Sequence, residues 1–67
     1  METYKRIGSK IEHTITLEPI TENETDVELR MDFIESGDVQ VFSMYMKNDI
    51  QTLREQLLLI GYYLVDS

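Results

Sequence analysis

Two stretches of the chain alternate between apolar and polar residues, which is the pattern of β-strands with one buried face. They span residues 10–18 and 25–34 and are joined by a polar, proline-led loop. The positions on the mainly apolar side of the two strands are Ile11, His13, Ile15, Leu17, Val27, Leu29, Met31 and Phe33. We predict a hairpin in which Leu17 lies opposite Val27, because this register brings both apolar rows to the same face.

A third strand is predicted over residues 39–46, where apolar residues occur on both sides. One side carries Val39, Val41 and Tyr45, and the other carries Phe42, Met44 and Met46. A two-residue turn at Ser36-Gly37 would direct the second set to the core, and a three-residue loop with a glycine bulge would direct the first set. The sequence leaves both registers open, and either one leaves apolar groups on both faces of the strand.

A helix is predicted after Asn48, which is a favoured N-cap residue. Apolar residues recur there at helical spacing, at Ile50, Leu53, Leu57, Ile60 and Leu64. The helix could continue to about Leu64 with Gly61 in its interior. Alternatively, Gly61 is a left-handed C-cap and residues 62–66 form a short strand, which their tyrosines and valine favour. We favour the second interpretation.

The predicted fold is therefore α+β: a three-stranded antiparallel meander packed by one C-terminal helix, with residues 62–66 as a short fourth strand in the favoured variant. Residues 1–9 have no clear period, and we interpret them as a flexible lead or a weak edge segment. With 67 residues in all, the chain is expected to be a single domain.

The composition limits the cellular compartments that can be expected for this domain. There is no cysteine, so no disulfide can stabilise it, and a reducing, cytoplasmic location is expected. The longest apolar run, residues 57–65, is too short to span a bilayer. The N-terminal residues have no apolar segment typical of a signal peptide. We expect neither membrane insertion nor secretion.

Negative charge is concentrated in the middle of the chain. The net charge is −7, and residues 18–38 hold eight acids with Arg30 as the only cation. Such a surface repels phosphate groups, so we expect no direct nucleic-acid binding, and it would suit a basic protein partner. The predicted partner-binding acids are Glu22, Glu24, Glu28, Asp32, Glu35 and Asp38.

Residues that could carry out chemistry are few. His13 is the only histidine and lies on an apolar row, so we interpret it as a packed residue. One histidine without cysteine makes a poor transition-metal site. Glu18 and Glu28 could approach each other across the hairpin, but on a polar face we interpret them as solvated surface. We expect no enzyme activity, no metal and no cofactor.

The surplus of apolar residues suggests self-association, because one helix covers only one face of a sheet. The candidate residues are Val39, Val41, Tyr45, Leu59 and Tyr63. We therefore expect a homodimer. The function predicted from the sequence is a small acidic protein-binding module, a non-enzymatic inhibitor or regulator of the kind that phages and mobile elements encode. The alternative is a homo-oligomeric structural protein without another target.

Overall fold

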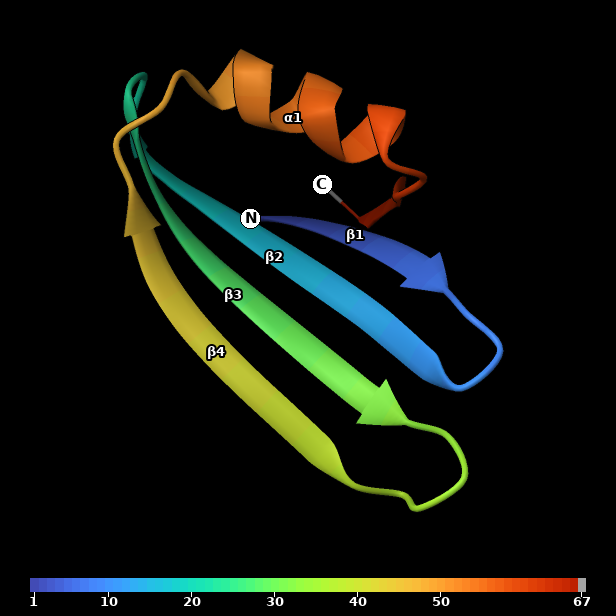
Figure 1. Cartoon of the computed structure of the whole chain (residues 1–67). Helices are drawn as coiled ribbons and strands as arrows, with labels where there is room; N and C mark the ends of the chain where they lie inside the picture. Colours follow the sequence, from blue (N-terminus) through green and yellow to red (C-terminus); the bar gives the residue numbers. More distant parts are fainter. Residues whose placement is uncertain (67) are drawn as a thin grey trace.

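The computed structural model describes residues 1–66, which form a five-stranded antiparallel sheet and one short helix (Figure 1). The elements are β1 (Glu2–Ile7), β2 (Ile11–Thr21), β3 (Glu24–Phe33), β4 (Val39–Met46), α1 (Ile50–Leu59) and β5 (Tyr63–Asp66). The strand order is β4-β3-β2-β1-β5. The predicted three-stranded meander with a helix is wrong, because four strands form the meander and a fifth strand pairs with the first.

The N-terminal segment accounts for the additional strand of the meander. Residues 2–7, for which we expected a flexible lead or a weak edge segment, form β1 between β2 and β5. Tyr4 lies opposite Ile15 and is only 3% exposed. Burial of this side chain raises the pKa of the Tyr4 phenol, and its hydroxyl donates a hydrogen bond to Glu2. The buried tyrosine fixes the strand to the sheet.

The predicted β2–β3 register is confirmed, with Leu17 opposite Val27. The apolar positions predicted to face the core therefore lie on one face. This face contacts the helix, and we call it the helix face; the opposite side of the sheet is the open face.

The register of β4 is set by a four-residue loop at residues 34–37, longer than either predicted turn. The amide of Phe33 donates to the carbonyl of Asp38 at 2.9 Å, and Gly37 closes the loop with φ of 74°, which glycine adopts readily. Phe42 lies opposite Leu29. The helix face of β4 therefore carries Phe42, Met44 and Met46. The predicted two-residue turn places the same three residues on this face, because two and four are both even numbers.

Both ends of α1 are capped. The carboxylate of Asp49 accepts a hydrogen bond from the amide of Thr52 at 3.3 Å, so the N-cap follows the predicted Asn48 by one residue. At the other end, the amide of Tyr62 donates to the carbonyl of Leu57 at 2.9 Å, and Gly61 has φ of 96°. This is a Schellman motif. The favoured interpretation of Gly61 as a C-cap before a strand is confirmed, although that strand is the fifth.

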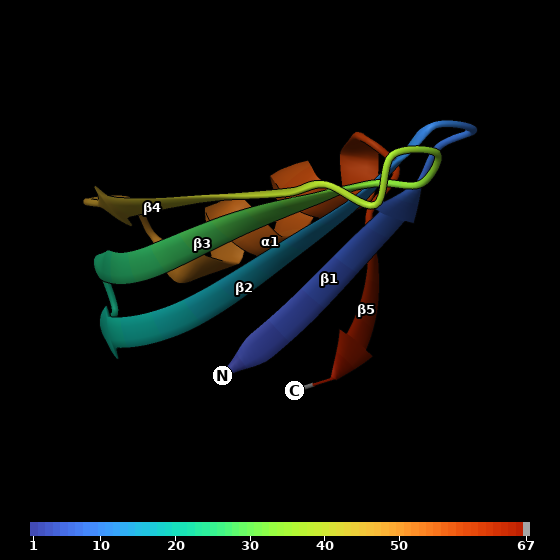
Figure 2. The ribbon, with the colours of Figure 1, turned by 90° about the horizontal axis from the view of Figure 1, so that it is seen from below.

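The helix lies over one end of the sheet (Figures 1 and 2), and the core lies beneath it. Its buried hydrophobic residues are Tyr4, Leu17, Val27, Leu53, Leu57 and Tyr62. Ten helical residues span about 15 Å, whereas the molecule is 38 Å long. The other end of the helix face therefore stays partly uncovered, and Phe42 there is 49% exposed.

An ion pair joins β1 to the helix. Arg54 Nε donates to Glu2 Oε1 at 2.8 Å, and Arg54 Nη2 donates to Glu2 Oε2 at 2.5 Å. These hydrogen bonds lower the pKa of the Glu2 carboxyl below its ordinary value of 4.5, against the opposing effect of burial. A bidentate pair of this geometry is both stronger and more specific than a single contact.

This ion pair predicts a pH-dependent part of the stability. A lowered pKa in the folded state stabilises the fold above the unfolded-state pKa, and this contribution is lost as the pH falls through the folded-state pKa. Glu2→Gln should lower the unfolding midpoint at neutral pH, and its difference from wild type should shrink below about pH 4.5. Denaturant titrations at several pH values measure this. A difference independent of pH would contradict the assignment.

Candidate functional site

The side chains with potential for chemistry are separated from one another. His13 is half-buried on the helix face, and its ring meets the edge of Tyr62 with 6.5 Å between centroids. The prediction that His13 is a packed residue is therefore confirmed. Among residues 1–66, no group of three histidine or acidic side chains is arranged to hold a metal ion.

The six acids predicted to bind a partner fall into three places. Glu28 and Asp32 lie on the open face of β3, and Asp32 is paired with Arg30 at 3.1 Å. Glu22 and Glu24 lie at the β2–β3 turn, while Glu35 and Asp38 lie at the β3–β4 loop. These two connections are at opposite ends of the elongated sheet (Figure 1). The six acids therefore do not form one patch.

A tighter acidic cluster lies on the open face, and two of its members were not among the predicted site residues. Glu18 on β2 is directly opposite Asp26 on β3, and Glu28 follows Asp26 two residues along the same face. We call Glu18, Asp26 and Glu28 the acidic cluster. The predicted register already contained the signal, because Leu17 opposite Val27 requires Glu18 opposite Asp26.

Three cations within residues 1–66 are paired with acids outside the acidic cluster. The ion pairs within residues 1–66 are Lys5–Glu12, Arg30–Asp32 and Arg54–Glu2. None of them includes a member of the cluster. Two of these pairs neutralise the other end of the open face. The cluster lies in the part of this face that holds none of the described ion pairs, and Arg30 acts on Glu28 only at longer range.

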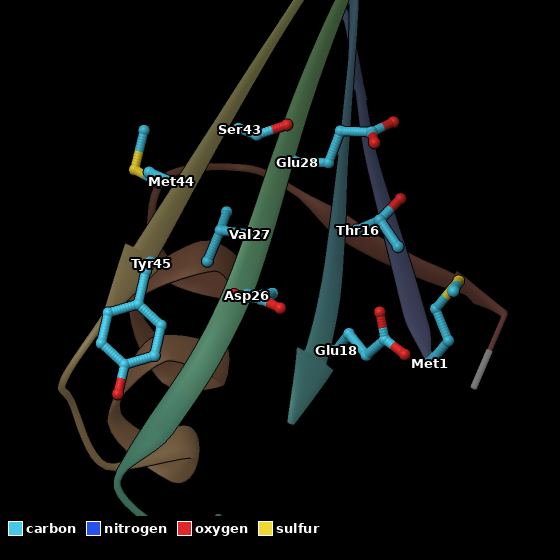
Figure 3. A pocket seen from close by; sticks show the side chains of 9 residues that line it. All are labelled: Met1, Thr16, Glu18, Asp26, Val27, Glu28, Ser43, Met44 and Tyr45. Carbon is cyan, nitrogen blue, oxygen red and sulfur yellow. The ribbon is translucent and has the colours of Figure 1, made fainter. Parts of the chain in front are cut away.

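The acidic cluster borders an open hollow of about 640 Å³ on the sheet (Figure 3). Its lining residues are Met1, Thr16, Glu18, Asp26, Val27, Glu28, Ser43, Met44 and Tyr45. Tyr45 lies opposite Asp26 on the neighbouring strand β4 and is 47% exposed. The hollow thus combines carboxylates with an accessible aromatic ring and the thioether of Met1.

The residues predicted for self-association do not form one surface. Val39, Val41 and Tyr45 lie on β4, at one edge of the sheet, and Tyr63 lies on β5, at the other edge. Leu59, at 84% exposed, is on the last turn of α1. Four strand spacings, about 19 Å, separate the two edges. Of this set, only the β4 residues are contiguous.

Comparison of the chain with family models, curated proteins and solved structures found no significant match. Within residues 1–66, the one helix is far too short to cross a membrane.

The acidic cluster should reduce the stability of the fold. Like charges directly opposite each other on an antiparallel pair are unfavourable. The double variant E18Q/D26N should therefore raise the unfolding free energy by up to about 1 kcal/mol at low salt, and the gain should shrink at high salt. Chemical denaturation at two ionic strengths measures this.

The matched control is E22Q/E35Q, which removes the same charge from two exposed connections. It should change stability less, since these residues do not face each other. An equal gain in both variants would mean that only the net charge matters, and would contradict a local repulsion between Glu18 and Asp26.

Proposed function

We propose that this chain is a small acidic protein-binding module of the cytoplasm, a non-enzymatic inhibitor or regulator that binds a basic segment of another protein. The observation that carries the proposal is the acidic cluster, whose three carboxylates share one face without a cation among the described ion pairs. A like-charge arrangement that costs stability is expected where charge serves binding rather than folding.

The chemistry of the hollow favours arginine or lysine side chains. A carboxylate accepts two parallel hydrogen bonds from a guanidinium group, which gives orientation as well as affinity. Glu18 and Asp26, on adjacent strands, have Cβ atoms about 5 Å apart by sheet geometry, which is close enough to share one cation. Tyr45 offers a ring face to the same cation or to its neighbour.

The size of the acidic cluster limits the kind of partner. Three carboxylates on two strands match a few basic residues in a loop or a peptide, whereas imitation of a nucleic-acid backbone would need the longer row of acids that the six predicted residues do not form. The net charge of −7 steers a basic partner toward the protein and repels nucleic acid.

Binding of an arginine-rich peptide tests the proposal. The triple variant E18Q/D26N/E28Q should lose affinity on the order of tenfold, because charge-assisted contacts are removed. Calorimetric titration gives the affinities, and peptide-induced amide shifts in NMR spectra locate the site. The shifts should centre on residues 16–18, 26–28 and 43–45.

The matched control is E22Q/E35Q/D38N, which changes the net charge equally but leaves the hollow intact. It should retain most of the affinity. If both triple variants weaken binding alike, or if the shifts spread over the whole molecule, the interaction is a general attraction between opposite charges and the proposed site is wrong.

A further inference from the structure

The edge formed by β4 lacks the features that normally protect a sheet edge. Such protection comes from charged residues, proline, bulges or very short strands. β4 is eight residues long, contains no charged residue and no proline, and pairs with β3 without a register shift. The opposite edge, β5, has only four residues and ends in Asp66. Figure 1 shows no other described segment beside the outer edge of β4.

The hydrogen-bonding pattern shows which backbone groups of β4 are unpaired. The amide of Phe33 donates to the carbonyl of Asp38, so these residues form a hydrogen-bonded pair. Such pairs alternate along an antiparallel ladder. The pairs Met31–Gln40 and Leu29–Phe42 are therefore bonded in the same way. The residues between them direct their N–H and C=O groups away from β3: Val39, Val41, Ser43 and Tyr45.

We propose that a second copy of this chain pairs with this edge, β4 against β4 in antiparallel orientation, to form one continuous ten-stranded sheet. Pairing centred on Phe42 is the register that satisfies all four outward residues in both copies. Val39 then lies opposite Tyr45 of the second copy, and Val41 lies opposite Ser43 of the second copy. A shift by two residues leaves one of the four without a strand partner.

The side chains of β4 suit this arrangement on both faces. Phe42 meets its own counterpart on the helix face as a non-hydrogen-bonded pair, in which side chains approach most closely. Aromatic cross-strand pairs are favourable. On the open face, the valines of one copy lie beside Tyr45 and Ser43 of the other. The half-exposed apolar groups on both faces of β4 are thus covered together.

The charged residues at the two ends of β4 favour antiparallel pairing with the β4 strand of a second copy. Lys47 immediately follows β4, and Asp38 immediately precedes it. With Phe42 at the centre, Lys47 lies opposite Gly37 of the second copy and one position from Asp38 of the second copy, and the same arrangement occurs at the other end. Successive strand positions point to opposite faces, so these two charges approach each other around the end of the strand. Parallel pairing would instead bring like charges together. The acids of β3 in the two copies stay three strand spacings apart, about 14 Å, beyond the screening length of about 8 Å at physiological salt.

This inference does not depend on the proposed function, because it rests on the edge of β4 and not on the acidic cluster. The cluster stays on the open face of such a dimer, but Tyr45, which lines the hollow beside it, also lies opposite Val39 of the second copy, so the two surfaces share this residue. The interface is small, so the dimer should form and dissociate with concentration, as interfaces at the low end of the size range do. Leu59 and Tyr63 lie outside it.

Sedimentation velocity of the full chain, from low to high micromolar concentration, tests the proposal. Ser43→Pro removes an outward N–H while leaving the ladder with β3 intact, and should abolish dimerisation with the circular dichroism spectrum unchanged. Leu59→Ser, at an exposed position away from the edge, should leave the dimer unaffected. A constant monomeric mass for the wild type overturns the proposal, as does a dimer that Ser43→Pro leaves intact or an open series of larger assemblies.

A charge exchange tests the register. Lys47→Glu and Asp38→Lys should each weaken dimerisation on the order of tenfold, because each places like charges together at two symmetric contacts. The double variant should restore most of the affinity. These residues lie at opposite ends of β4, so restoration must arise between copies. If Lys47→Glu weakens and Asp38→Lys strengthens the dimer, only net charge matters and the register is wrong.

Discussion

The antiparallel pairing of β2 with β3 is the interaction on which the other elements depend. It runs from Ile11 opposite Phe33 to Pro19 opposite Thr25, and it places Leu17 and Val27 side by side beneath the helix. A shift by one residue would move every apolar side chain of one strand to the other face. The same pairing brings Glu18 opposite Asp26, so the register that builds the core also creates the acidic cluster.

The short helix determines how much of the sheet is stabilised. Its two capped ends limit α1 to ten residues, enough to cover Leu17, Val27 and Tyr4 but not the far end of the helix face or the edge at β4. On the covered side, polar contacts support the packing. Arg54 binds Glu2, and Arg6 lies over the ring of Tyr62, 5.2 Å from its centroid. The proposed binding surfaces lie on the side that these contacts do not reach.

The elements with regular patterns could be predicted from the sequence, and those stabilised by polar contacts could not. The hairpin register and the glycine that ends the helix follow from alternation and from capping rules. β1 has no such pattern, because its helix-face positions are Glu2, Tyr4 and Arg6. Only the tyrosine is apolar, and the two charged residues tolerate this face because Arg54 and the carbonyl of Ile60 bind them. These partners are more than fifty residues away.

The candidate site was only partly predictable for a related reason. Charge density along the chain identified Glu28 as part of an acidic surface, but it gave equal weight to Glu22 and Glu35, which lie at different ends of the sheet. The predicted register already placed Glu18 opposite Asp26, but which acids are neutralised by ion pairs depends on side-chain positions. Likewise, the predicted three-stranded meander already placed residues 39–46 at an edge, but it could not show that β1 and β5 both add to the other side and leave β4 uncovered.

Amide hydrogen exchange at low protein concentration tests the central claim most directly, namely that the sheet is built outward from β2 and β3 and has no cover at β4. Protection should be greatest in the β2–β3 ladder. Within β4 it should alternate, with the amides of Phe42 and Met44 exchanging slowly and those of Val41 and Ser43 exchanging fast. Equal protection of both sets in the monomer would show that another segment covers this edge, and would contradict the account.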